Sequence, residues 1–115
     1  MAEITYIEWH VHPGRADRWF EAWLPGAERA LSFGARGWSL TRSQDDPLHF
    51  RQAIVWDSHD DFDRYWYSDE IAALREEVIN LYNKPLMITW HSLAAAGGEA
   101  EVEPGPEPVR AAEQA

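Results

Sequence analysis

The sequence predicts an α+β fold in which strands and helices follow the order β-α-β-β-α-β. Two segments carry this prediction, 4–12 and 49–56, because each has the apolar character of a half-buried strand and is followed by a turn signal and an amphipathic helix. Two further short segments with strand character, 37–42 and 86–93, complete the order.

The first strand–helix unit covers residues 4 to about 31. Pro13-Gly14 ends the strand, and a three-and-four spacing of apolar residues predicts a helix from Arg15 to about Leu31. Pro25 has no backbone N–H, so we expect it to kink or split this helix near Leu24. Alternation along the strand places one apolar set on the side expected to face the core: Thr5, Ile7, Trp9 and Val11.

The second unit begins with two strands, 37–42 and 49–56, joined by the turn residues 43–47. Such a short connection predicts antiparallel pairing. Ser58 is a helix-capping residue, and the helix that follows restarts at Ser68 and continues to about Tyr82. Lys84-Pro85 stops it, and residues 86–93 form the last strand. This is the ferredoxin-like order, a four-stranded antiparallel sheet with helices on one face.

The other face of such a sheet has no helices over it. In this chain that face carries apolar and aromatic residues, whichever way the strands are phased. A large patch of this kind is typical of an interaction surface, and a second copy related by a two-fold axis is the simplest partner. We therefore expect a homodimer formed through the sheet faces.

Composition excludes several classes of function. The chain of 115 residues has a net charge of −10, so it lacks the positive surface needed to bind nucleic acid or an anionic membrane. It contains no cysteine, which excludes a disulfide framework, a thiolate nucleophile and a zinc finger. No export signal and no apolar run of membrane-spanning length is present. We expect a soluble, cytoplasmic protein.

The composition changes near the C-terminus, where glycine, proline and glutamate dominate. We expect one folded domain over residues 1–95 and an acidic, Pro/Gly-rich flexible tail over residues 96–115.

Three motifs point to a family: Val11-His12-Pro13-Gly14, the 37–43 strand with Asp45-Asp46-Pro47 behind it, and Val55-Trp56-Asp57-Ser58 followed by Phe62 and Ser68. Over roughly residues 4–93 the chain resembles the antibiotic biosynthesis monooxygenases, a family of dimeric α+β barrels. The resemblance implies oxygenation of a small hydrophobic or aromatic substrate, phenolic or quinol-like, with no metal, flavin or other cofactor.

The family also contains a haem-degrading branch, which this chain does not match. Where that branch has an asparagine, a tryptophan and a histidine, this chain aligns Ile7, Tyr65 and Arg75. An arginine offers no lone pair to a haem iron, so haem degradation is the less favoured activity.

Cofactor-free oxygenation needs a general base, a positive charge near the substrate anion and an apolar pocket. One of the strand histidines His10, His49 and His91 is the expected base, and the Tyr65 hydroxyl is expected to orient a phenolic substrate. The expected substrate-binding residues are Trp9, Trp38, Trp56, Phe62, Trp66 and Arg42.

Each of these residues also has a purely structural interpretation. Aromatic side chains on strands and on one helix face are what a core requires, and strand histidines and arginines form edge ion pairs. Glu8, His10 and His12 lie along a single strand and span too far for one ion without a further ligand, which His49 or His91 could supply. Strand histidines without a matched second pair are weak evidence for a metal site, so we predict none. A non-catalytic ligand-binding dimer, or a polyketide cyclase or isomerase, fits the same scaffold, since fold alone does not select a function.

Overall fold

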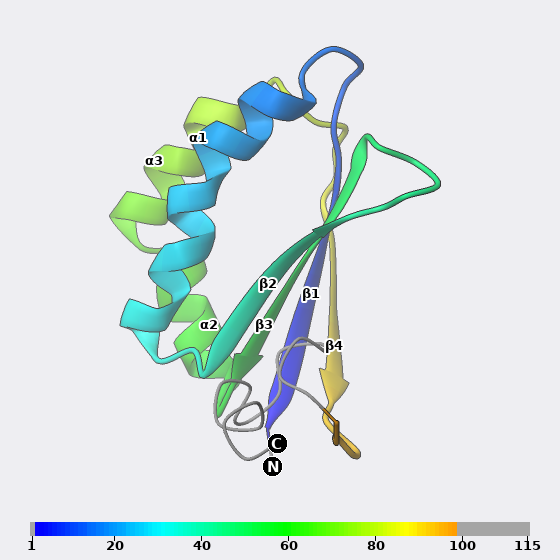
Figure 1. The fold of residues 1–115 in the computed structure, drawn as a ribbon. Coiled ribbons are helices and arrows are strands. Elements are labelled where there is room, and N and C mark those ends of the chain that lie inside the picture. The colour runs from blue at the N-terminus through cyan, green and yellow to red at the C-terminus, as the bar shows by residue number, and fades with distance from the viewer. Residues whose placement is uncertain (1, 99–115) are drawn as a thin grey trace.

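A four-stranded antiparallel sheet forms one layer of the protein and the helices form the other (Figure 1). The computed structural model describes residues 2–98. The strands are β1 (Glu3–His10), β2 (Gly37–Arg42), β3 (His49–Trp56) and β4 (Met87–Ser92). The helices are α1 (Ala16–Glu28), the 3-10 helix η1 (Arg29–Phe33), α2 (His59–Trp66) and α3 (Asp69–Val78).

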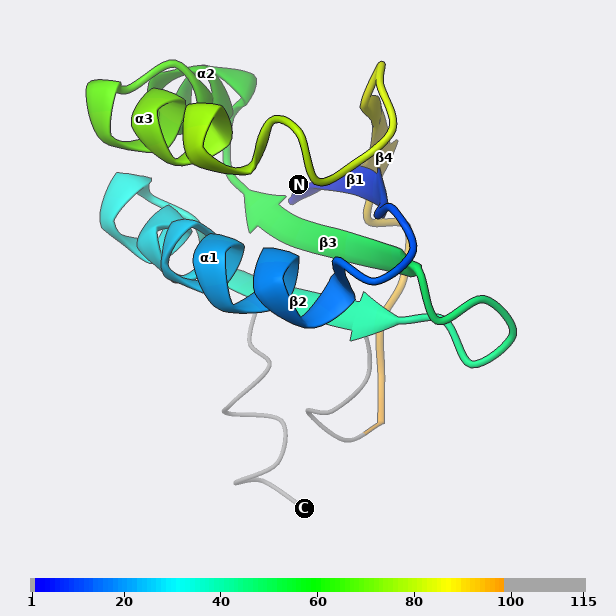
Figure 2. The same cartoon turned by 90° about the horizontal axis from the view of Figure 1, so that it is seen from above.

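The sheet has the strand order β2-β3-β1-β4, so β1 and β3 are central. β1 pairs antiparallel with β3 and with β4, and β2 pairs antiparallel with β3. Figure 2 shows α1, α2 and α3 on the same side of this sheet. The predicted ferredoxin-like arrangement, with helices on one face, is confirmed.

The strand phase expected from alternation is also confirmed. Thr5, Ile7, Trp9 and Val11 are each at most 1% exposed. Register extends this buried face across the sheet, because directly opposite residues in an antiparallel pair share a face. Thr5 lies opposite Ile54 on β3 and Trp90 on β4, and Trp9 lies opposite Phe50.

Large aromatic side chains fill the layer between sheet and helices. The largest fully buried ones come from both layers: Trp9, Trp19, Trp23, Trp56 and Tyr65. Burying each large side chain of this kind stabilises the fold by roughly 1.5–3 kcal/mol. These aromatic side chains on the strands and helices are therefore core residues.

The sequence predicted that Pro25 would kink or split its helix near Leu24. The helix does not split there. α1 continues through Pro25 to Glu28 and becomes a 3-10 helix only at Arg29. Trp23 and Ala27, which flank the proline, are both fully buried. Packing on both sides of Pro25 therefore holds the helix together although one backbone hydrogen bond is missing.

The break between α2 and α3 falls where the sequence predicted a restart. The Ser58 hydroxyl accepts a hydrogen bond from the Asp60 backbone N–H, and the Ser68 hydroxyl accepts one from Ile71. Both serines are thus N-caps, which satisfy backbone donors that a helix leaves open at its start.

The acidic tail predicted from residue 96 lies, beyond Gly98, outside the described residues, and the division at residue 95 stays a prediction. Within residues 2–98, no helix has the length and apolar character needed to cross a membrane.

Candidate functional site

Gln52 is the polar centre of the aromatic interior. Its Oε1 atom accepts hydrogen bonds from the indole N–H of Trp23 at 3.0 Å and of Trp9 at 3.3 Å. Its Nε2 atom donates to the Tyr65 hydroxyl at 3.3 Å, and that hydroxyl donates to the Gly26 carbonyl at 2.7 Å. One buried amide therefore connects β1, β3, α1 and α2.

Tyr65 stays protonated in this setting. Burial raises the pKa of the Tyr65 hydroxyl well above its ordinary value, and the hydrogen bond from Gln52 and the charge of Arg75 offset only part of this. A phenol that holds its proton so firmly cannot act as a base near neutral pH, and its one O–H is already donated to the Gly26 carbonyl.

A second part of the interior lies where β1 begins and β3 and β4 end. The rings of Trp56 and Phe62 are 6.1 Å apart, and those of Phe62 and Trp90 are 5.3 Å apart, both edge to face. Four buried side-chain polar atoms have no hydrogen-bond partner among the described residues: Thr5 Oγ1, Trp19 Nε1, Trp56 Nε1 and Arg75 Nε. Thr5 Oγ1 and Trp56 Nε1 are the two that belong to these strands. Both residues have no exposed surface.

His59 and Glu3 lie at the outer edge of this region. The Nε2 atom of His59 is 2.5 Å from Glu3 Oε1, and its ring stacks on Trp90 with centroids 3.7 Å apart and planes 18° apart. The His59 side chain is 56% exposed and that of Glu3 34% exposed. The pair thus lies between solvent and the buried rings.

The sheet face without helices carries a different polar cluster. Glu8 binds His49 at 2.6 Å and Arg51 at 3.0 Å. Burial alone would raise the pKa of the Glu8 carboxyl, but these two hydrogen bonds and the nearby positive charges together hold it below its ordinary value. The His10 ring stacks on His49 at 4.4 Å, and Arg51 lies over the Tyr6 ring at 4.7 Å.

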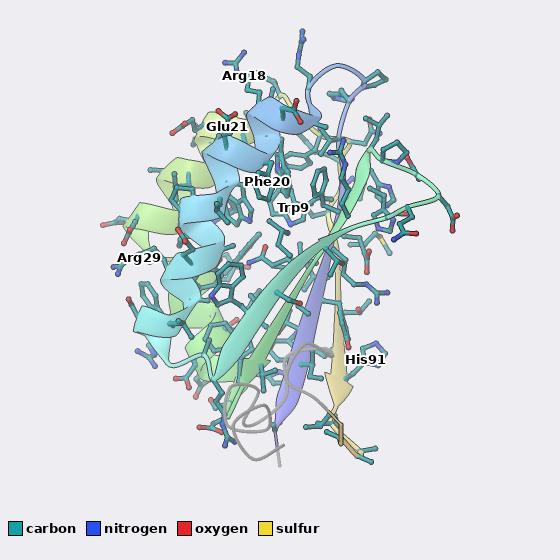
Figure 3. All side chains as sticks on the ribbon, viewed as in Figure 1. Trp9, Arg18, Phe20, Glu21, Arg29 and His91 are labelled. Atoms are coloured by element: carbon teal, nitrogen blue, oxygen red, sulfur yellow. The ribbon has the colours of Figure 1, made fainter. Side chains whose placement is uncertain are left out.

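The residues expected from the sequence to form one site fall on two sides of the sheet. Figure 3 shows Trp9 directed toward the helices and His91 away from them. By register, His10 and His49 share the side of His91. The remaining predicted residues lie on the helix side or on α2: Trp9, Trp38, Trp56, Phe62, Tyr65, Trp66 and Arg42.

These helix-side residues differ in depth. Phe62, Tyr65 and Trp66 are buried, Trp38 is half-buried and packs against the same core, and Arg42 is exposed with its guanidinium 5.0 Å from the centre of the Phe50 ring. One chain therefore brings the predicted aromatic surface together but separates it from the predicted histidine bases.

Sequence reasoning missed Gln52, Glu3 and His59. An amide at a core-facing position of an otherwise apolar strand was the available signal for Gln52. The pairing of Glu3 with His59 had no signal along the chain, because 56 positions separate them and only the fold joins them. Among residues 2–98, no group of three or more histidine, cysteine or acidic residues is arranged to hold a metal ion.

Solved structures share this ferredoxin-like fold. A Nitrosomonas europaea protein assigned as an antibiotic biosynthesis monooxygenase matches with a TM-score of 0.75 and 17% identity, over 84% of this chain and 94% of that one. No protein-family model and no curated protein matches the sequence.

Two further structures give the same result. Rv0793 from Mycobacterium tuberculosis has a TM-score of 0.73 and 14% identity, over 85% of this chain and 100% of its own. SnoaB from Streptomyces nogalater, a cofactor-independent oxygenase solved as a mutant, has a TM-score of 0.70 and 18% identity, over 82% of this chain and 95% of its own. The chain therefore has the fold of the antibiotic biosynthesis monooxygenases, as the sequence resemblance implied.

Proposed function

We propose that this protein is a cofactor-independent monooxygenase that acts on a small aromatic substrate, phenolic or quinol-like, bound between the helices and the sheet. The observation that carries the proposal is that two of the four unpartnered buried polar atoms, Thr5 Oγ1 and Trp56 Nε1, belong to neighbouring strands of the aromatic interior. Both groups can donate a hydrogen bond to a ligand oxygen, and an indole N–H can only donate.

The reaction needs few protein groups beyond these aromatic rings and the two hydrogen-bond donors. A substrate that loses a proton becomes an electron-rich anion and can itself pass an electron to O₂. The rings of Trp56, Phe62 and Trp90 exclude water, and the two donors favour negative charge on the substrate oxygen. Low dielectric strengthens these hydrogen bonds relative to water.

We also propose a homodimer formed through the sheet faces. The face without helices carries an apolar cluster of Ala2, Ile4, Ala53 and Val55, all buried within the single chain, with Tyr6 and Leu93 partly buried against it. Met87, which shares this face by register with Glu8, is 54% exposed. In such a dimer His10, His49 and His91 lie near the interface, so their role as bases requires a site at that face. The cytoplasmic location stays a prediction.

Oxygen uptake tests the activity. With anthrone under air, each turnover consumes one O₂ and converts anthrone into anthraquinone and water. We expect the purified protein to accelerate O₂ consumption in proportion to its concentration, after subtraction of the uncatalysed oxidation. Heat-denatured protein gives the baseline. Uptake equal to that baseline, with anthrone and with a quinol, overturns the proposal.

A non-catalytic ligand-binding module is the second candidate function. The complete burial of Trp9, Trp23 and Tyr65 favours a non-catalytic protein, because core packing accounts for these aromatic side chains without any reaction. Saturable quenching of tryptophan fluorescence by anthraquinone, together with no O₂ uptake, supports this alternative over the monooxygenase.

A further inference from the structure

The contact between Glu3 and His59 pairs a carboxylate with an imidazole, and the two groups often act together in general-base catalysis. His59 Nε2 lies 2.5 Å from Glu3 Oε1. An ionised carboxylate only accepts, so in a neutral His59 the proton belongs on Nε2, the nitrogen that faces Glu3. In that tautomer the other ring nitrogen, Nδ1, holds a lone pair. A carboxylate in this position also stabilises the positive imidazolium that forms once Nδ1 accepts a proton.

Register places two of the four unpartnered buried polar atoms, Thr5 Oγ1 and Trp56 Nε1, near this pair. Trp56 lies directly opposite Glu3 in the β1–β3 ladder, and Thr5 lies directly opposite Trp90 in the β1–β4 ladder. Opposite side chains of an antiparallel pair are in contact range on one face of the sheet. His59 bridges these two rows, since it binds Glu3 and stacks on Trp90.

We propose that Glu3 and His59 are the general-base pair of this protein, acting on a phenolic or quinol substrate whose oxygen is held by Thr5 Oγ1 and Trp56 Nε1. This inference rests on the proposed function and names its catalytic base. The substrate O–H bond breaks, its electron pair stays on the oxygen, and the proton binds His59 Nδ1. Because His59 and Glu3 are partly exposed, the proton then passes to solvent.

The other carboxylate–histidine pair of the described residues lies in a different environment. Glu8 and His49 face away from the helices, and Glu8 is also bound to Arg51. The two unpartnered strand atoms, Thr5 Oγ1 and Trp56 Nε1, are on the helix side of the sheet, as are Glu3 and His59. Of these two pairs in the described part of the chain, Glu3–His59 is therefore the one that has an aromatic ring and buried donors on its own side of the sheet.

Kinetics of variants test the base. We expect His59→Gln to lower the rate of O₂ uptake per active site by roughly 100-fold or more, the usual size of a general-base contribution, and to remove the acidic limb of the pH–rate profile. Glu3→Gln lowers the rate less, and Glu3→Asp restores part of it. The matched control is His12→Gln, which keeps the wild-type rate and profile. His59→Gln with the rate and pH profile of His12→Gln overturns the inference.

A bound probe separates this inference from the proposed activity. The phenolate of 4-nitrophenol absorbs in the visible range, so its ionisation on the protein is measured directly and needs no oxygenation. We expect wild-type protein to favour the bound phenolate, His59→Gln to bind the probe mainly as the phenol, and Thr5→Val to weaken binding several-fold with little change in side-chain size. Thr41→Val, on the other sheet face, is the control.

The two sets of results have different meanings. A wild-type protein that ionises the probe through His59 but consumes no O₂ contradicts the monooxygenase and keeps the base pair. A protein that consumes O₂, and for which His59→Gln changes neither rate nor probe ionisation, keeps the monooxygenase and overturns the base pair.

Discussion

At the scale of single residues, Gln52 provides hydrogen-bond partners for three buried aromatic side chains. Two indole N–H groups point at one amide oxygen, and the same side chain donates to Tyr65. Buried polar groups without partners are costly, so a change at this one position affects groups on both layers.

Replacing Gln52 with leucine leaves the indole N–H groups of Trp9 and Trp23 without an acceptor. We expect Gln52→Leu to lower the free energy of unfolding by about 2–4 kcal/mol, measured by urea denaturation. Gln44→Leu in the exposed turn is the control and should change stability by less than about 0.5 kcal/mol. Equal stability of the two variants contradicts the network.

Tyr65 gives stability a pH dependence whose sign is fixed by its raised pKa. The folded state keeps the phenolic proton, whereas the unfolded chain releases it above about pH 10. The stabilisation from Tyr65 is therefore complete below that pH and is lost as pH rises above it.

We expect the midpoint of urea unfolding to fall between about pH 8 and about pH 11, and to fall less steeply in Tyr65→Phe. Burial also raises the pKa of Tyr82, so part of the slope remains. Tyr67, with its side chain mostly exposed, provides the control: Tyr67→Phe should keep the wild-type slope. A wild-type slope in Tyr65→Phe contradicts this assignment.

At the scale of elements, the ends of the helices set how the aromatic faces meet. Gly34 ends η1 with a φ of 102°, a left-handed conformation that other residues adopt at a cost. A Cβ atom at this position would also lie 3.1 Å from an Asp61 carboxylate oxygen. The chain needs glycine here to turn from η1 into β2.

We expect Gly34→Ala to destabilise the protein by about 1–2 kcal/mol in urea denaturation. Gly97→Ala is the matched control, because a Cβ there meets nothing within 4 Å and the residue has no positive φ. A loss at Gly34 no larger than at Gly97 contradicts the role of this turn.

At the scale of the whole molecule, the proposed dimer predicts that a charge introduced on the sheet face disrupts the dimer, whereas a charge introduced on the helix side does not. Met87 on the sheet face and Leu31 on η1 are both 54% exposed. An arginine at Met87 would bring a further positive charge into the interface beside Glu8, whose carboxylate already binds His49 and Arg51. Burying that charge against the second copy costs far more than exposing it to water.

Light scattering after size exclusion gives the mass. We expect the wild type and Leu31→Arg to have twice the mass of one chain, and Met87→Arg to shift toward the mass of one chain. A wild type that is a single subunit at micromolar concentration contradicts the dimer, and equal masses for the two variants place the interface elsewhere.

The sequence by itself determined the order of elements, the strand phase and the helix caps. These features depend on neighbours along the chain: alternation placed Thr5 and Trp9 on the core face, and Ser58 and Ser68 marked helix starts because a hydroxyl bonds to an N–H two or three residues on. Pro25 shows the limit of this local reasoning, since packing of Trp23 and Ala27 carried the helix through it.

The tertiary structure alone decided which side chains meet. It put the histidines His10, His49 and His91 on one side of the sheet and the aromatic surface on the other. It also brought Glu3 to His59 across the β1–α2 contact. Such encounters depend on how strands pair and where a helix packs, and no spacing along the chain records the distance between residues that are far apart in sequence.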